Sequence, residues 1–99
     1  MEVFNFLANL KFSTQEEVEE LVYEDEKTRI LRTLSLNQVT DFMTQDEDEA
    51  VLLLDGLASI ETPTETIRMK RGDFLFIPKG TRHRVVDQER AVWLCIFYK

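Results

Sequence analysis

Short runs of β-branched and aromatic residues alternate with turn-forming residues through almost the whole chain after Lys27. Such runs, bounded by Gly, Pro and polar pairs, are typical of β-strands. Turns are predicted at residues 62–65, where Pro63 presets a backbone φ angle, and at residues 87–90. Many short, closely spaced strands favour an antiparallel sandwich or barrel. We expect strands over residues 28–36, 49–54, 57–61, 66–70, 74–77, 83–87 and 91–98.

The stretch before Lys27 has a different pattern. Residues 13–16, Ser-Thr-Gln-Glu, match a capping box, in which the serine hydroxyl accepts a backbone N–H and the glutamate reaches back to the cap. Val18, Leu21 and Val22 follow with the spacing of one helical face. The sequence therefore predicts a short N-terminal helix over about residues 14–24.

Length and charge limit the classes of protein to which the chain can belong. Its 99 residues, 43% of them hydrophobic, suit one domain, and we expect residues 1–27 to form an N-terminal segment with the helix and residues 28–99 to form a β-barrel. The net charge of −7 would be repelled by nucleic acids and anionic membranes, so neither is an expected partner. No apolar run is long enough for a membrane span and no basic leader is evident, so a cytoplasmic location is expected.

Cysteine and histidine are each present once, as Cys95 and His83. A disulfide within the chain and a four-ligand Cys/His zinc site are therefore excluded. Cys95 lies in an apolar strand and is expected to be a small buried residue, because no base is placed beside it by the sequence.

Residues 72–83 carry the most specific pattern, Gly-Asp-Phe-Leu-Phe-Ile-Pro-Lys-Gly-Thr-Arg-His. Pro78 ends strand pairing because it lacks an N–H, Gly80 permits a tight reversal, and His83 opens the next strand. Here the sequence resembles the cupin superfamily, whose second signature has Gly, Pro, Gly and His at this spacing. The whole chain also looks like a group of small stand-alone bacterial cupins. The resemblance implies an all-β fold of the cupin type, a double-stranded β-helix or jelly-roll barrel, here with the short N-terminal helix.

The first cupin signature is only half present. Glu49 and Gly56 match its second half. The two histidines that precede the glutamate in the family are replaced by Met43 and Gln45, or, under a spacing one residue longer, by Phe42 and Thr44.

This departure weakens the metal site that the resemblance implies. Cupin enzymes commonly hold iron, manganese, nickel or another divalent ion with three histidines and one glutamate. A chain with one histidine cannot supply that set, nor the two histidines of a non-haem iron triad. What remains is His83, Glu49 and Gln45, one nitrogen and two oxygens that suit a labile manganese, iron, nickel or zinc ion.

Strand parity predicts that Glu49 faces the barrel interior. It shares a strand face with Val51 and Leu53, so its carboxylate points inward if their side chains do. An inward carboxylate needs a partner, because a buried unpaired charge is costly. His83 is the expected partner, either as part of a site or simply as a barrel-lining imidazole bonded to Glu49 or water. The same parity directs the neighbouring arginines, Arg82 and Arg84, outward.

Three functions remain open. The first is a binding module that accepts a small polar molecule through His83 and Glu49 and whose metal chemistry is lost or weakened. The second is an enzyme in which a divalent ion on Glu49, His83 and Gln45 serves as Lewis acid for isomerisation, hydrolysis or oxygen chemistry on a small acid or sugar. The third is a structural or partner-binding protein. The missing histidine pair favours the binding module.

The last predicted strand is apolar on both faces. One face can line the barrel, and the other must be covered by the apolar N-terminal residues or by a second subunit. We therefore expect a homodimer.

Overall fold

The computed structural model describes residues 1–99 and contains six β-strands and no α-helix. No segment forms a helix of the length and hydrophobicity needed to cross a membrane. The strands are β1 (Val18–Glu24), β2 (Thr28–Ser35), β3 (Asp48–Glu61), β4 (Thr66–Lys70), β5 (Phe74–Ile77) and β6 (Arg84–Tyr98).

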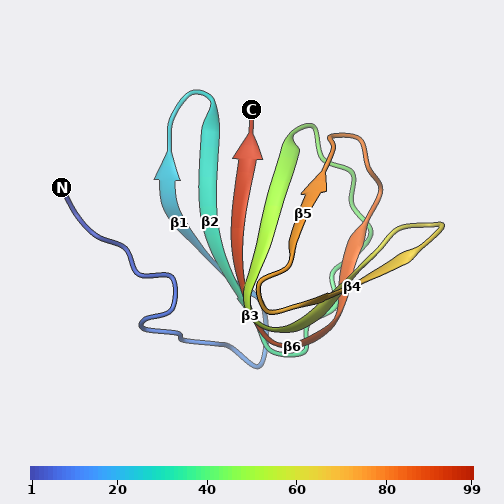
Figure 1. Cartoon of the computed structure of the whole chain (residues 1–99), viewed down its shortest axis with the longest axis horizontal. Coiled ribbons are helices and arrows are strands. Elements are labelled where there is room, and N and C mark those ends of the chain that lie inside the picture. Colours follow the sequence, from blue (N-terminus) through green and yellow to red (C-terminus); the bar gives the residue numbers. More distant parts are fainter.

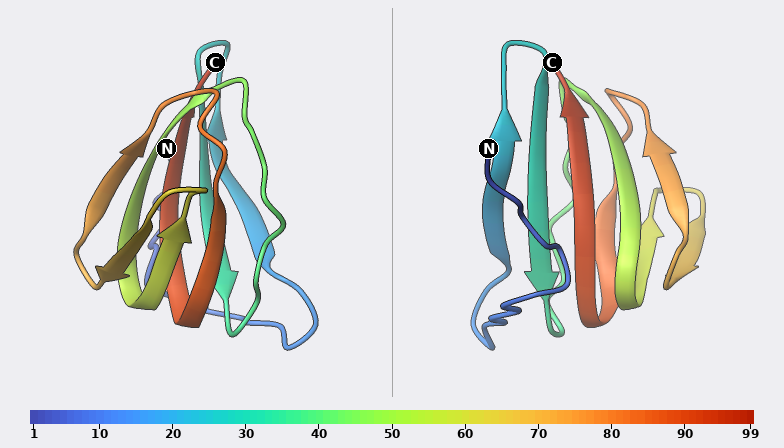
Figure 2. Two further views of the ribbon diagram at one scale, coloured as in Figure 1. Left: turned by 90° about the vertical axis from the view of Figure 1, so that its right-hand side faces the viewer. Right: turned by 60° about the vertical axis from the view of Figure 1, so that its left-hand side comes forward.

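All strand pairs are antiparallel and belong to one sheet in the order β1-β2-β6-β3-β4, with β5 paired to β3 beside this path (Figure 1). β3 and β6 are much longer than the others, at 14 and 15 residues. Both curve into a U, so that the sheet folds back on itself and encloses a core (Figure 2). The expected all-β, antiparallel architecture is confirmed.

Two pairs of predicted strands are continuous in the structure. Residues 49–54 and 57–61 both belong to β3, and residues 83–87 and 91–98 belong to β6 except for His83, which stands just before it. The predicted turn at residues 87–90 is wrong, because the chain bends there within β6 instead of reversing. The turn at residues 62–65 is confirmed, with the Thr62 amide donating to the Glu65 carbonyl at 2.8 Å.

The bends of β3 and β6 lie against each other. Gly56 has a φ of +87°, while Asp87 and Arg90 have φ values of 51° and 47°, all in the left-handed region. The pairing of the two strands shifts register on either side of Gly56. A Cβ at Gly56 would lie 2.3 Å from the Arg90 carbonyl oxygen, so only glycine permits this close approach.

The predicted N-terminal helix is wrong. Residues 18–24 form β1, which pairs with β2 from Val18 opposite Leu34 to Glu24 opposite Arg29. The Ser13 hydroxyl does accept a backbone N–H, from Gln15 at 3.1 Å, but in a local turn. Short helices depend on tertiary packing for most of their stability, and here the same residues gain a ladder of strand hydrogen bonds instead.

The buried core lies inside the curled sheet, and the N-terminal segment covers part of the outside. Arg32 points outward from β2 and is only 2% exposed. Its guanidinium donates to the carbonyl oxygens of residues 5, 6, 8 and 9 and pairs with Glu20. On the outer face of β5, Phe74 and Phe76 remain 63% and 48% exposed. The core residues are Val51, Leu53, Ala58, Ile60, Met69, Ile77, Ala91, Trp93, Cys95 and Phe97.

Candidate functional site

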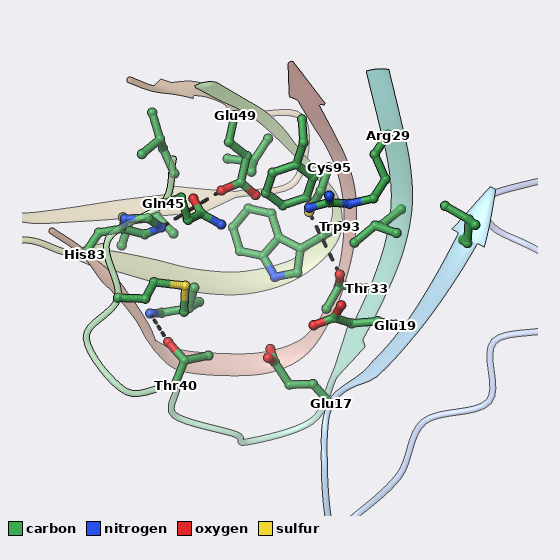
Figure 3. A pocket seen from close by; sticks show the side chains of 18 of the residues that line it. Glu17, Glu19, Arg29, Thr33, Thr40, Gln45, Glu49, His83, Trp93 and Cys95 are labelled. Carbon is green, nitrogen blue, oxygen red and sulfur yellow. Dashed lines mark hydrogen bonds and ion pairs between the residues drawn. The ribbon is translucent and has the colours of Figure 1, made fainter. Parts of the chain in front are cut away.

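A cavity of about 470 Å³ opens inside the curled sheet (Figure 3). Alternate residues of the strands point into it, which is the arrangement that strand parity predicts. Roughly half of its lining residues are hydrophobic. The lining comprises Glu17, Glu19, Leu21, Glu24, Arg29, Leu31, Thr33, Thr40, Met43, Gln45, Glu49, Val51, Ile60, Ile77, His83, Val85, Trp93, Cys95 and Phe97.

His83 and Glu49 meet at this cavity, as the sequence predicted. They are 2% and 6% exposed, and 4.0 Å separates His83 Nε2 from Glu49 Oε1. The other ring nitrogen, Nδ1, lies 2.8 Å from the Thr81 carbonyl oxygen. A carbonyl oxygen only accepts hydrogen bonds, so Nδ1 carries the proton. In the neutral ring Nε2 therefore offers a lone pair to the cavity.

Burial alters the acidity of Glu49. Removal from water raises the pKa of its carboxyl group from 4.5 to about 7, although Cys95, Gln45 and the more distant Arg29 act in the opposite direction. Near neutral pH the carboxyl group is thus present in both forms. It can accept a hydrogen bond when ionised and donate one when protonated.

The structure also decides between the two spacings of the first signature. Met43 pairs with His83 through two backbone hydrogen bonds, at 2.8 and 3.0 Å, and the side chains of both Met43 and Gln45 line the cavity. Phe42 instead lies outside the cavity, with the guanidinium groups of Arg82 and Arg84 stacked on its ring. The shorter spacing is therefore the correct one.

The outward direction of the arginines was predicted, but the partner of Arg84 was not. Arg84 Nη2 lies 2.6 Å from Glu61, which belongs to the neighbouring strand β3. Strand pairing explains this contact, because Glu61 stands directly opposite Arg84.

Gln45 contributes a polar atom without a partner. Its Oε1 atom is buried and has no hydrogen bond. Buried polar atoms in proteins are almost always hydrogen-bonded, so this oxygen is an unsatisfied acceptor in a residue of the cavity wall.

The donors at the four signature positions do not fit a tightly held divalent metal. They are the thioether of Met43, the amide of Gln45, the carboxyl of Glu49 and the imidazole of His83. Nowhere in the chain do three or more His, Cys, Asp or Glu side chains gather closely enough to hold an ion. Manganese, iron, nickel and zinc favour imidazole and carboxylate donors, of which this set has only one each.

Sequence reasoning missed the opposite wall of the cavity. Glu17 and Glu19 fall within the predicted helix, but in the structure they line the cavity from β1 and the residue before it. Arg29 is also at the wall, where its guanidinium lies 4.4 Å from the centre of the Phe97 ring and 3.1 Å from Glu47. The sequence carries no clear strand signal here, because Glu17, Glu19 and Leu21 fall on one strand face and mix polar with apolar residues.

A buried network fixes the indole of Trp93 in the cavity. Trp93 Nε1 donates to Gln88 Oε1 at 2.9 Å, and Gln88 Nε2 donates to Glu17 at 3.0 Å. Ser35 donates to the same Glu17 oxygen at 2.5 Å. These bonds connect β6 to the residue that precedes β1, so the position of the indole depends on both.

Cys95 is buried in the cavity wall, as expected. Burial raises the pKa of its thiol well above the ordinary value, and the nearby Glu49 adds to this effect. A neutral, buried thiol is a poor nucleophile.

Comparisons with known proteins agree with this architecture. Residues 38–97 match the family model for the cupin domain. The chain resembles the crystal structure of a proposed mannose-6-phosphate isomerase from Ralstonia eutropha JMP134 with a TM-score of 0.92 and 26% identity, covering 100% of this chain and 99% of that one. An RmlC-like cupin protein from Desulfovibrio desulfuricans gives a TM-score of 0.88 at 24% identity, over 99% and 96% of the two chains.

Among curated proteins, the uncharacterised protein YdbB of Bacillus subtilis (strain 168) is 42% identical over 55 residues. This match covers 54% of the chain and 49% of YdbB, so it spans about half of that relative. Because the family model covers more than half of the chain, including Glu49 and His83, the chain belongs to the cupin family.

Proposed function

We propose that the barrel binds a small molecule directly, without a metal ion. The polar group of this molecule is held by His83, Glu49 and Gln45. Its apolar part packs against the hydrophobic wall formed by residues such as Val51, Ile77 and Phe97. This arrangement is typical of small-molecule sites, which are largely apolar with a few convergent polar groups.

The observation that carries the proposal is a cavity of about 470 Å³ whose lining residue Gln45 has an unpaired Oε1 atom. A buried acceptor without a partner costs about 1–3 kcal/mol. A ligand that donates to this atom recovers that free energy, and the neighbouring Nε2 of His83 and carboxyl of Glu49 can bind the same polar group.

A metal-dependent enzyme is the alternative in this family, and the name of the Ralstonia eutropha protein suggests a phosphorylated sugar as a substrate. Two features of this chain argue against that alternative. The four signature positions hold only one imidazole and one carboxylate. The cavity also has four carboxylates in its lining, which would repel a phosphate group.

Trp93 provides the test, because it is the only tryptophan in the sequence and lines the cavity. A library of small fragments with charged and neutral polar heads is titrated against the protein, and Trp93 fluorescence is followed. We expect saturable changes with some fragments, unaffected by EDTA. Their affinity should fall about tenfold in Gln45→Leu, the effect of losing one buried hydrogen bond.

Gln15→Leu is the matched control, because Gln15 is exposed and lies outside the cavity. Its affinities should equal those of the wild type. The proposal is wrong if no fragment changes Trp93 fluorescence, or if EDTA abolishes every response and added manganese, nickel or zinc restores it.

A further inference from the structure

The ionisable groups around the cavity are mostly acidic. Glu17, Glu19, Glu24 and Glu49 line it, whereas Arg29 is its only arginine and no lysine is present in the lining. Figure 3 shows Glu17 and Glu19 across the cavity from His83. A molecule inside is therefore surrounded by carboxylates on more than one side.

The arginine, indole and Nδ1 donors of the cavity wall are already engaged elsewhere. Arg29 is paired with Glu47 at 3.1 Å. The indole N–H of Trp93 is bonded to Gln88, and Nδ1 of His83 is bonded to the Thr81 carbonyl. Apart from the amide N–H groups of Gln45 and the hydroxyl of Thr40, the wall consequently offers few free hydrogen-bond donors to a ligand.

Acceptors, in contrast, remain available. Gln45 Oε1 has no partner, and the contact of Glu49 with His83 is as long as 4.0 Å. Glu19 is exposed on β1 and takes part in none of the ion pairs of the chain. The complement of such a wall is a ligand that brings its own donors and a positive charge.

The aromatic residues of the wall favour the same kind of ligand. Trp93 and Phe97 line the cavity, and the face of an aromatic ring attracts a cation. The Phe97 ring already has the Arg29 guanidinium 4.4 Å from its centre.

From this distribution of donors, acceptors and charge we propose that the ligand is a small organic cation, a primary ammonium compound with an apolar body. The ammonium group binds among Gln45, Glu49 and the Glu19 side of the cavity, and the apolar body packs on Trp93 and Phe97. This inference rests on the proposed function and adds the chemical class of the ligand. Phosphorylated and carboxylated molecules are therefore not expected as ligands of this cavity.

The test uses three probes with the same ring and two-carbon spacer: phenethylammonium, 2-phenylethanol and 3-phenylpropanoate. Near pH 8 a primary ammonium group remains protonated, since its pKa is about 10. Binding is measured by Trp93 fluorescence and by calorimetry. We expect phenethylammonium to bind about tenfold more tightly than 2-phenylethanol, 3-phenylpropanoate to give no saturable response, and added salt to weaken ammonium binding.

Three variants locate the charge that is recognised. Glu49→Gln should reduce the preference for the ammonium probe over the alcohol to about twofold, and Glu19→Gln should reduce it to a smaller extent because that carboxylate is exposed. Glu65→Gln is the control, since Glu65 is an exposed residue of the β3–β4 turn. It should leave the preference at the wild-type value.

The outcomes separate this inference from the proposed function. If the alcohol or the carboxylate binds as tightly as the ammonium probe, or if the preference survives Glu49→Gln, the ligand class is wrong while the binding function stands. If none of the three probes binds but neutral or anionic fragments change Trp93 fluorescence, the ligand class is again wrong. If no compound of any charge changes it, both proposals are wrong.

Discussion

Replacing Glu49 by glutamine tests whether its burial has the electrostatic cost that the structure implies. The pKa of its carboxyl group is 4.5 in water-exposed form and about 7 in the fold. At about 1.4 kcal/mol per pKa unit, this difference corresponds to a free energy of about 3 kcal/mol. Glutamine has nearly the same shape and does not ionise, so Glu49→Gln removes the cost.

The direction in which stability changes with pH follows from the raised pKa of Glu49. The fold favours the protonated carboxyl group, so the stability linked to it is complete below pH 4.5 and is lost as the pH rises through about 7. Between about pH 5.5 and pH 8.5, wild-type protein should therefore lose about 2 kcal/mol relative to Glu49→Gln.

The assay is urea unfolding followed by circular dichroism at these two pH values, for wild type, Glu49→Gln and the exposed control Glu65→Gln. All other titrations are common to the three proteins, so the difference from wild type isolates position 49. The reasoning is refuted if the free energies of unfolding of wild type and Glu49→Gln differ by the same amount at both pH values. A pH-dependent difference of equal size in Glu65→Gln would refute it as well.

Three further predictions concern the framework of the site. Gly56→Ala should lower the free energy of unfolding by at least about 2 kcal/mol more than Gly72→Ala does, as measured by thermal or urea unfolding. Both glycines have positive φ, but only at Gly56 would a Cβ meet backbone oxygens. Equal losses of stability in the two variants would contradict this. Gln88→Leu should lower the free energy of unfolding by about 2–3 kcal/mol, because it leaves the Trp93 N–H without its acceptor. A decrease below about 0.5 kcal/mol in urea unfolding would contradict this. The homodimer remains a prediction: sedimentation equilibrium should give a dimer that Phe76→Lys converts to a monomer, since Phe76 is exposed on β5, and a monomeric wild type would disprove it.

Much of the barrel could be predicted from the sequence because its strands have breakers at their ends. Pro78 and Gly80 mark the end of β5, and the parity of Glu49 with Val51 places the carboxyl group inside. The spacing from Gly72 to His83 was specific enough to indicate the family. These signals are local, so they could be read without knowledge of the tertiary pairing.

The parts that could not be predicted depend on contacts between distant segments. Residues 18–24 have apolar positions compatible with a helix, and only pairing with β2 makes them a strand. The choice of Met43 over Phe42 is made by the backbone bridge to His83, forty residues later in the chain. The bend at Asp87 and Arg90 resembles a turn in the sequence, but its real role is to follow the bend at Gly56 in the facing strand.

The position of β6 in the sheet has a consequence for how the protein is made. This strand comes after all the others in the chain, yet it lies between β2 and β3. On the ribosome, β2 and β3 are both synthesised before the strand that joins them, and each must wait with one hydrogen-bonding edge open to solvent or to other nascent chains. Stable folding is therefore delayed until β6 has emerged, and a chain arrested before Arg84 would retain only the hairpins that its earlier strands can form.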